Sequence, residues 1–199
     1  TGILPAEWTT IEVTPTLGLS RLEPWARVRI CGMVEGYRAR IFKGSGAKIA
    51  FFSLEDQSGR IEVKVRERQI DAYESLLQSG EPLLVSGKLS FPQTEDGEEE
   101  GPREPTLLFD EAVLLADAVR TETRAVHLKL RGERHRAEDV PRLREILESN
   151  PGSCPISVEV GLGTGRLCRL SLGAVRVEPT DQLFGQLEKL LGSQVIELR

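Results

Sequence analysis

The chain has 199 residues, carries 31 acidic against 26 basic side chains for a net charge of −5, and is 39% hydrophobic. This length fits one large domain or two small ones, each able to bury a core without disulfides, and no apolar run is long enough to cross a membrane. The chain starts at Thr1 without a signal-like segment, so we expect a cytoplasmic piece of a longer protein. Three cysteines without a CxxC pair favour a reducing compartment and no zinc site.

The first half of the chain predicts a short lead-in and then a β-barrel. Residues 1–26 hold three prolines and no sustained periodicity, so we expect them to pack loosely. The pattern then predicts strands at 27–43, 47–54, 60–66, 82–91 and 106–115, with a helix at 67–79. The third strand is the clearest, because three apolar residues alternate there with charged ones. This order predicts a five-stranded OB-fold barrel over residues 27–117.

Residues 118–199 predict a second, smaller unit. Strands are expected at 123–130, 155–160, 166–177 and 194–198, and helices at 139–149 and 180–191. Thr180 is a candidate N-cap of the last helix and Gly192 its stop signal. The resulting order β-α-β-β-α-β is typical of a ferredoxin-like domain, so the whole chain is predicted to be α+β.

Charge is unevenly distributed along the chain. Residues 27–54 carry six basic groups against one acidic group, whereas residues 92–105 carry six acidic groups against one basic group. Local charge steers a polyanion more than the net total does. The basic stretch coincides with the first loop that OB barrels use to bind oligonucleotides, and the acidic stretch with the second. We interpret the acidic run as a solvated loop rather than a metal site.

These features predict a nucleic-acid-binding face on the barrel and no catalytic site. Phosphates require cations, and single strands require aromatic platforms on which bases stack. If Leu54 belongs to the core, strand alternation places Phe52 inside and Phe51 on the binding face. The alternative is that these Lys and Arg residues are ordinary solvent-exposed surface residues and that both phenylalanines lie in the interior. The candidate binding residues are Arg38, Arg40, Phe42, Lys43, Lys48, Phe51, Arg60, Lys64 and Arg66.

Particular stretches of the chain resemble a known family. Residues 28–34, 50–63 and 84–90 resemble the OB domain near the C-terminus of the bacterial DNA polymerase III alpha subunit, the DnaE family. The motif Leu-Glu-Asp-Gln-Ser-Gly-Arg-Ile-Glu-Val at 54–63 is also similar to OB domains of aminoacyl-tRNA synthetases. The likeness continues through residues 170–172, 176–177, 181–183 and 190–195, which look like that subunit's C-terminal domain.

The resemblance implies a non-catalytic part of a DNA-directed DNA polymerase, a nucleotidyltransferase whose catalytic domains and Mg²⁺ lie upstream; it implies no cofactor in this fragment. It also implies that the OB domain contacts single-stranded template DNA and that the C-terminal domain binds the tau subunit of the clamp loader. Such a protein works in the bacterial cytoplasm, associated with the nucleoid. Family members commonly carry basic residues at the positions of Arg38, Lys43, Lys48 and Arg60.

The sequence departs from the family in two places, and two other functions stay open. The acidic loop is longer and more charged than the family's usual connection, and residues 1–26 contain no clamp-binding peptide, so we do not expect clamp binding. One alternative is an RNA-binding module of the synthetase type, whose barrel reads an anticodon loop. The other is a small-molecule regulatory domain that dimerises through residues 118–199.

Overall fold

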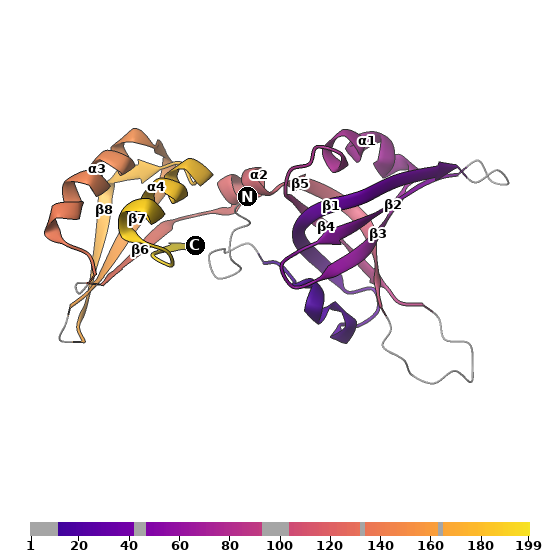
Figure 1. The fold of residues 1–199 in the computed structure, drawn as a ribbon, viewed down its shortest axis with the longest axis horizontal. Coiled ribbons are helices and arrows are strands. Elements are labelled where there is room, and N and C mark those ends of the chain that lie inside the picture. The colour runs from indigo at the N-terminus through magenta and orange to yellow at the C-terminus, as the bar shows by residue number, and fades with distance from the viewer. Residues whose placement is uncertain (1–11, 42–46, 93–103, 132–133, 163–164) are drawn as a thin grey trace. The chain divides into compact units, whose positions relative to one another are not determined.

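The structure, a computed structural model, describes residues 12–41, 47–92, 104–131, 134–162 and 165–199. The chain divides into two compact units, which comprise Glu12–Leu115 and Ala116–Arg199 among the described residues. Figure 1 traces the helices and strands of both in chain order. In the described ranges, no helix is long and apolar enough to cross a membrane.

Five strands of the first unit close into a barrel in the order β1-β2-β3-β5-β4 (Figure 1). All neighbouring strands are antiparallel except β3 and β5, which run parallel. The elements are β1 (Arg27–Ile41), β2 (Lys48–Glu55), β3 (Arg60–Arg66), α1 (Glu67–Leu77), β4 (Leu83–Ser90) and β5 (Thr106–Leu114). The predicted OB-fold is therefore confirmed, with its helix after the third strand.

The interior of the barrel is filled by every second residue of the strands. On β3, the apolar residues at 61, 63 and 65 are buried, while the charged residues between them point outward. On β2, Phe52 and Leu54 are almost completely buried, as the alternation predicts. Helix α1 adds Ile70 and Leu77 to the same core. Each such side chain contributes about 1.5–3 kcal/mol through burial, so the inward set determines the register.

Two glycines allow the long strand β1 to pair with β4 along its first half and with β2 along its second. Gly36 has a φ of 64° and sits in a bulge, where the pairing with β2 shifts between Glu35 and Arg38. A Cβ added to Gly32 would lie 2.5 Å from the carbonyl oxygen of Glu55. The bend predicted from these glycines is present, and the second position leaves no room for a side chain.

Residues 12–26 pack firmly on the barrel, so the expectation of a loose lead-in is wrong for this part. The short helix η2 (Thr16–Arg21) inserts Leu19 into the barrel core, where 1% of the residue is exposed. The Thr16 backbone N–H and hydroxyl donate to the Asp56 carboxylate at 2.8 and 2.7 Å, and the Ser58 N–H donates at 2.7 Å. Burial opposes ionisation of Asp56, but these hydrogen bonds outweigh it and lower the pKa of the carboxyl.

The second unit is a four-stranded sheet with strand order β8-β7-β6-β9. Its elements are α2 (Leu115–Glu122), β6 (Val126–Arg131), η3 (Ala137–Asp139), α3 (Val140–Ser149), β7 (Pro151–Gly161), β8 (Leu167–Val177), α4 (Asp181–Leu191) and β9 (Ile196–Leu198). The predicted order β-α-β-β-α-β is present. The ferredoxin-like arrangement is not confirmed, because β6 pairs directly with β7 in parallel, whereas a split βαβ unit has another strand between these two.

Helix α4 covers the core of this second unit. It buries Leu183, Leu187 and Leu191 at helical spacing and contacts α3 and β9. The Thr180 hydroxyl accepts a hydrogen bond from the Leu183 N–H at 3.3 Å, as expected for an N-cap. Gly192 ends the helix with a φ of 88°. Both predicted ends of this helix are confirmed.

Candidate nucleic-acid interface

The outward side chains of β1, β2 and β3 form a face that combines positive charge with one aromatic ring. Strand register places Phe51 of β2 between Arg38 of β1 and Lys64 of β3. The next outward position along the same strands places an isoleucine between two further arginines. We call this set the basic face; it consists of Arg38, Arg40, Ile49, Phe51, Lys64 and Arg66. Phe51 is half-buried and lies on the side opposite to Phe52, as the alternation predicts.

Most cations of the basic face are available for a ligand. Arg40 and Arg66 are exposed and Lys64 is half-buried, and none of the three makes an ion pair within the described ranges. Arg38 lies 3.9 Å from the Glu62 carboxylate, and both side chains are more than half exposed. An exposed pair of this kind contributes about 0–1 kcal/mol. A phosphate can therefore compete for Arg38 at little cost.

Lys48, predicted as a binding residue, points to the other side of its strand. It is an even-numbered residue of β2, like Phe52 and Leu54, so it faces inward and reaches α1. Its ammonium group lies 3.4 Å from Asp71 and 3.7 Å from Glu74, and its side chain is 28% exposed. The structure thus separates Lys48 from the basic face and balances its charge with two carboxylates.

The remaining predicted residues fall at the two ends of this face. Arg60 is exposed at the start of β3, on the same outward side as Lys64 and directly opposite Glu55 of β2. Phe42 and Lys43 lie outside the described residues, as does most of the acidic segment 92–105. The structure therefore brings together Arg38, Arg40, Phe51, Lys64 and Arg66, with Arg60 farther along β3.

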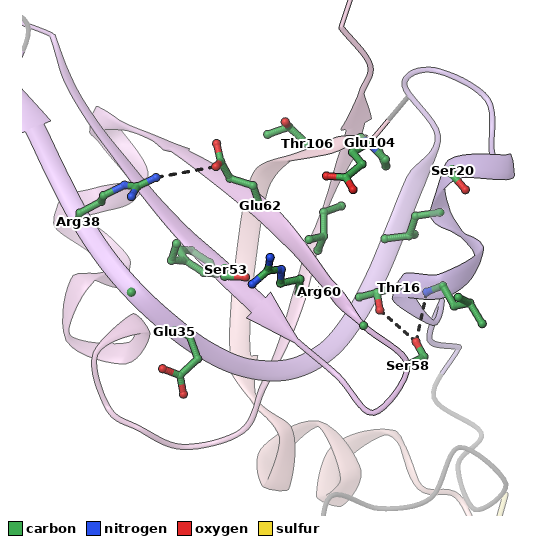
Figure 2. Close-up of a pocket in the computed structure, with 17 residues that line it drawn as sticks. Thr16, Ser20, Glu35, Arg38, Ser53, Ser58, Arg60, Glu62, Glu104 and Thr106 are labelled. Carbon is green, nitrogen blue, oxygen red and sulfur yellow. Dashed lines mark hydrogen bonds and ion pairs between the residues drawn. The ribbon is translucent and has the colours of Figure 1, made fainter. Parts of the chain in front are cut away.

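A cleft of about 750 Å³ shares Arg38 with the basic face and extends toward the β2–β3 turn. Figure 2 shows the side chains that line it. Its walls come from η2, β1, β2, β3 and the start of β5. Its lining includes three carboxylates and two guanidinium groups, from Glu35, Glu62, Glu104, Arg38 and Arg60. Sequence reasoning missed this cleft. The register of the β2–β3 hairpin could have indicated part of it. Counting back from the turn at 56–59 pairs Ser53 with Glu62, and both residues line the cleft.

Cys31 and His127 have surroundings that favour their neutral forms. The three cysteines are free, and burial followed by the nearby Asp56 charge raises the pKa of the Cys31 thiol to about 11. Burial, with a smaller contribution from Arg199, lowers the pKa of His127, whose Nδ1 lies 2.7 Å from the Ser157 hydroxyl. No group of three or more His, Cys, Asp or Glu residues in the described ranges could hold a metal ion.

Comparison with known proteins relates the chain to one polymerase subunit. Residues 28–115 match the OB-fold nucleic acid binding domain family. The DNA polymerase III alpha subunit of Escherichia coli K12 is 31% identical over 186 residues, which are 90% of this chain and 15% of that protein. The Vibrio cholerae subunit is 30% identical over 171 residues, 85% of this chain and 14% of that protein.

Solved structures similar to this chain include a mitochondrial single-stranded DNA binding protein from S. cerevisiae. It is 14% identical, with a TM-score of 0.37, and the match covers 46% of this chain and 96% of that one. The chain spans about 15% of the length of the polymerase subunits that it matches. The resemblance expected from the barrel motifs and from the second half of the chain is confirmed.

Proposed function

Because 90% of this chain is related to part of the DNA polymerase III alpha subunit, we propose that it is an accessory part of a bacterial replicative polymerase whose barrel binds single-stranded template DNA. The observation that carries this proposal is the basic face, in which Arg38 and Lys64 flank Phe51. OB-folds bind oligonucleotides on these strands. We assign catalysis and Mg²⁺ to other parts of the polymerase, because this chain corresponds to only about 15% of the related alpha subunit. We place the polymerase in the cytoplasm, at the nucleoid.

The proposed binding mode follows from the strand spacing. Neighbouring strands lie about 4.8 Å apart, so the side chains on either side of Phe51 are within reach of a nucleotide stacked on its ring. A base stacks on Phe51 while its flanking phosphates contact Arg38 and Lys64. Arg40 and Arg66 extend the positive charge along the same strands. Such contacts bind any sequence. They weaken as the salt concentration rises, because the release of counterions from the DNA then gains less entropy.

Fluorescence anisotropy with labelled oligo-dT, over a series of salt concentrations, tests the DNA proposal. The four cations of the basic face predict a slope of log K against log salt no steeper than about −2.8, because each phosphate contact with a single strand contributes about −0.7. The double variant Arg40→Ala/Arg66→Ala should make this slope less steep by about 1.4. Lys48→Ala is the control, and it should leave the slope unchanged because Lys48 faces Asp71 and Glu74.

Three outcomes would contradict the DNA proposal. Binding that is absent, or independent of salt, removes the role of the phosphates. An effect of Lys48→Ala as large as that of the double variant removes the role of the basic face. Preference for a structured RNA hairpin over oligo-dT would instead favour the synthetase-type alternative.

For the second unit, we propose that it binds the tau subunit of the clamp loader, again on the ground of the relationship to the alpha subunit. Strand β8 supports an interaction role, because it lies at the edge of the sheet and leaves Leu167 69% and Leu170 49% exposed. Exposed apolar edge strands are typical sites for pairing with another chain. These two leucines are therefore the residues to change.

Capture of the full chain by immobilised tau tests this second proposal. The double variant Leu167→Arg/Leu170→Arg should lose at least tenfold in affinity, because two buried contacts of this size exceed 1.4 kcal/mol. Val140→Arg is the control, since Val140 is also exposed but lies on α3. Unchanged capture by the double variant would refute this use of β8, and failure of the wild-type chain to bind tau would refute the proposal itself.

A further inference from the structure

The cleft beside the basic face differs from it in charge. Glu35, Glu62 and Glu104 line the cleft together with Arg38 and Arg60, so carboxylates outnumber cations there. The basic face lies farther along the same strands, beyond Glu62, and its charged side chains are all cations, although it shares Arg38 with the cleft. A phosphate entering the cleft would meet like charge, whereas one on the basic face would not. We therefore expect a bound strand to keep its phosphates and one stacked base on the basic face and to turn a neighbouring base toward the cleft.

Two side chains of β3 present a donor and an acceptor side by side in this cleft. Arg60 and Glu62 are two residues apart on one strand, so they project from the same face about 7 Å apart along it. Figure 2 shows both lining the cleft, with Ser53 of β2 nearby. Arginine only donates hydrogen bonds, and an ionised glutamate only accepts them. The two together offer a donor and an acceptor that a base edge can match or fail to match.

We propose that this cleft reads the edge of an unstacked base and favours cytosine and guanine over thymine. Cytosine presents its N4 amino group to Glu62 and its adjacent N3 and O2 acceptors to Arg60, and guanine presents its adjacent N1–H and N2–H donors to Glu62 and its O6 acceptor to Arg60. Thymine has a single donor, N3–H, between its O4 and O2 acceptors, so it offers Arg60 no pair of adjacent acceptors, and its O4 lies where cytosine carries N4, facing the carboxylate without a proton between them. This inference rests on the proposed binding of single-stranded DNA.

The surroundings of the pair suit this role. Within the described ranges, Glu62 makes one ion pair, with Arg38 at 3.9 Å, and both side chains are more than half exposed, so Glu62 can turn toward a base at little cost. The rim of the cleft is held in place, because Thr16, Asp56 and Ser58 are joined by hydrogen bonds of 2.7–3.0 Å. A rigid rim lowers the ordering entropy lost on binding.

The test compares oligo-dC with oligo-dT of equal length, by anisotropy with the full chain at pH 8, where cytosine is neutral. Both are pyrimidines, and a difference that depends on Glu62 reports the base edge rather than the strength of stacking. We expect oligo-dC to bind about fivefold more tightly, the low end for a good side-chain contact to a base because the site is partly exposed. Glu62→Gln should abolish this preference, because an amide can also donate to O4 of thymine.

Glu55→Gln is the matched control. This substitution removes the same charge from the outward side of the same hairpin, but Glu55 does not line the cleft. It should retain the preference for oligo-dC. Equal affinity of the wild-type chain for the two oligonucleotides would overturn the inference, as would a preference that survives Glu62→Gln or disappears in Glu55→Gln. Equal but salt-sensitive binding leaves the proposed function intact, whereas no binding to either oligonucleotide refutes both.

Discussion

Replacing Phe51 with alanine tests whether the basic face is a stacking platform or only a patch of charge. Removal of an aromatic platform costs about 1–3 kcal/mol per stacked base. Phe51 is half-buried between the strands that carry Arg38 and Lys64, so only part of its ring is available to a base. We therefore expect the lower part of that range, a fivefold to tenfold rise in Kd for oligo-dT.

The salt dependence of this variant separates stacking from charge. Loss of a neutral ring should raise Kd by the same factor at every salt concentration and leave the slope of log K unchanged. Ile49→Ala is the control, because Ile49 occupies the next outward position of β2 but has no aromatic face. Phe51→Trp should restore affinity. Wild-type affinity in Phe51→Ala, or an equal loss in Ile49→Ala, would refute the stacking argument, provided that thermal unfolding shows both variants folded.

Three further predictions concern stability and thiol chemistry. Asp56→Asn should lower the free energy of unfolding by about 1–2 kcal/mol through weaker hydrogen bonds. Because the folded state lowers the pKa of Asp56, its contribution is present above about pH 4 and is lost as the pH falls through the folded-state pKa, so urea titrations of variant and wild type should converge in acid; a gap that persists at pH 2 would count against this. Gly32→Ala should cost about 1–3 kcal/mol by overpacking against the Glu55 carbonyl, measured as a shift in urea midpoint, and a neutral effect would refute the close approach. Cys168 is exposed while the other cysteines are half-buried or buried, so a thiol reagent should modify one cysteine quickly in the native chain; three equally fast reactions would contradict the structure.

The barrel was predictable because its local signals agree with one another. The alternation at 60–66 locates β3 to the residue, and the turn residues at 56–59 and the glycine at 80 limit the elements on either side. Closure followed from the order of elements, which matches a known barrel. The packing of residues 12–26 on the barrel could not be predicted from local patterns. It depends on the insertion of Leu19 into the core and on hydrogen bonds from Thr16 to Asp56, forty residues away.

The sheet order of the second unit shows why element order is not topology. The sequence predicted each of its strands and both of its longer helices, α3 and α4. The pairing of β6 with β7 is a long-range choice that no local pattern reports. Strand β8, placed at the sheet edge by this pairing, is exposed along most of its length, although its composition reads as a half-buried strand.

The site was predictable where the period of two was applied, and missed where it was not. Alternation from Leu54 places Phe51 outward, and the same counting places Lys48 inward, beside α1. Charge alone had grouped Lys48 with Arg38, although strand geometry assigns them to opposite sides. In a barrel, the residue type determines the charge. Its odd or even position along the strand determines whether that charge points outward to a ligand or inward to the protein.

The same reasoning explains how a chain with a net charge of −5 can present a cationic surface. Charges separated by more than about 8–10 Å are largely screened at physiological salt, so a ligand responds to its immediate surroundings rather than to the total. The outward positions of β1, β2 and β3 place cations toward one end of the strands and carboxylates toward the cleft at the other. In the proposed binding mode, such a division orients a strand of nucleic acid as well as attracting it, because phosphates favour the cations at one end of the face and base edges the mixed charges at the other.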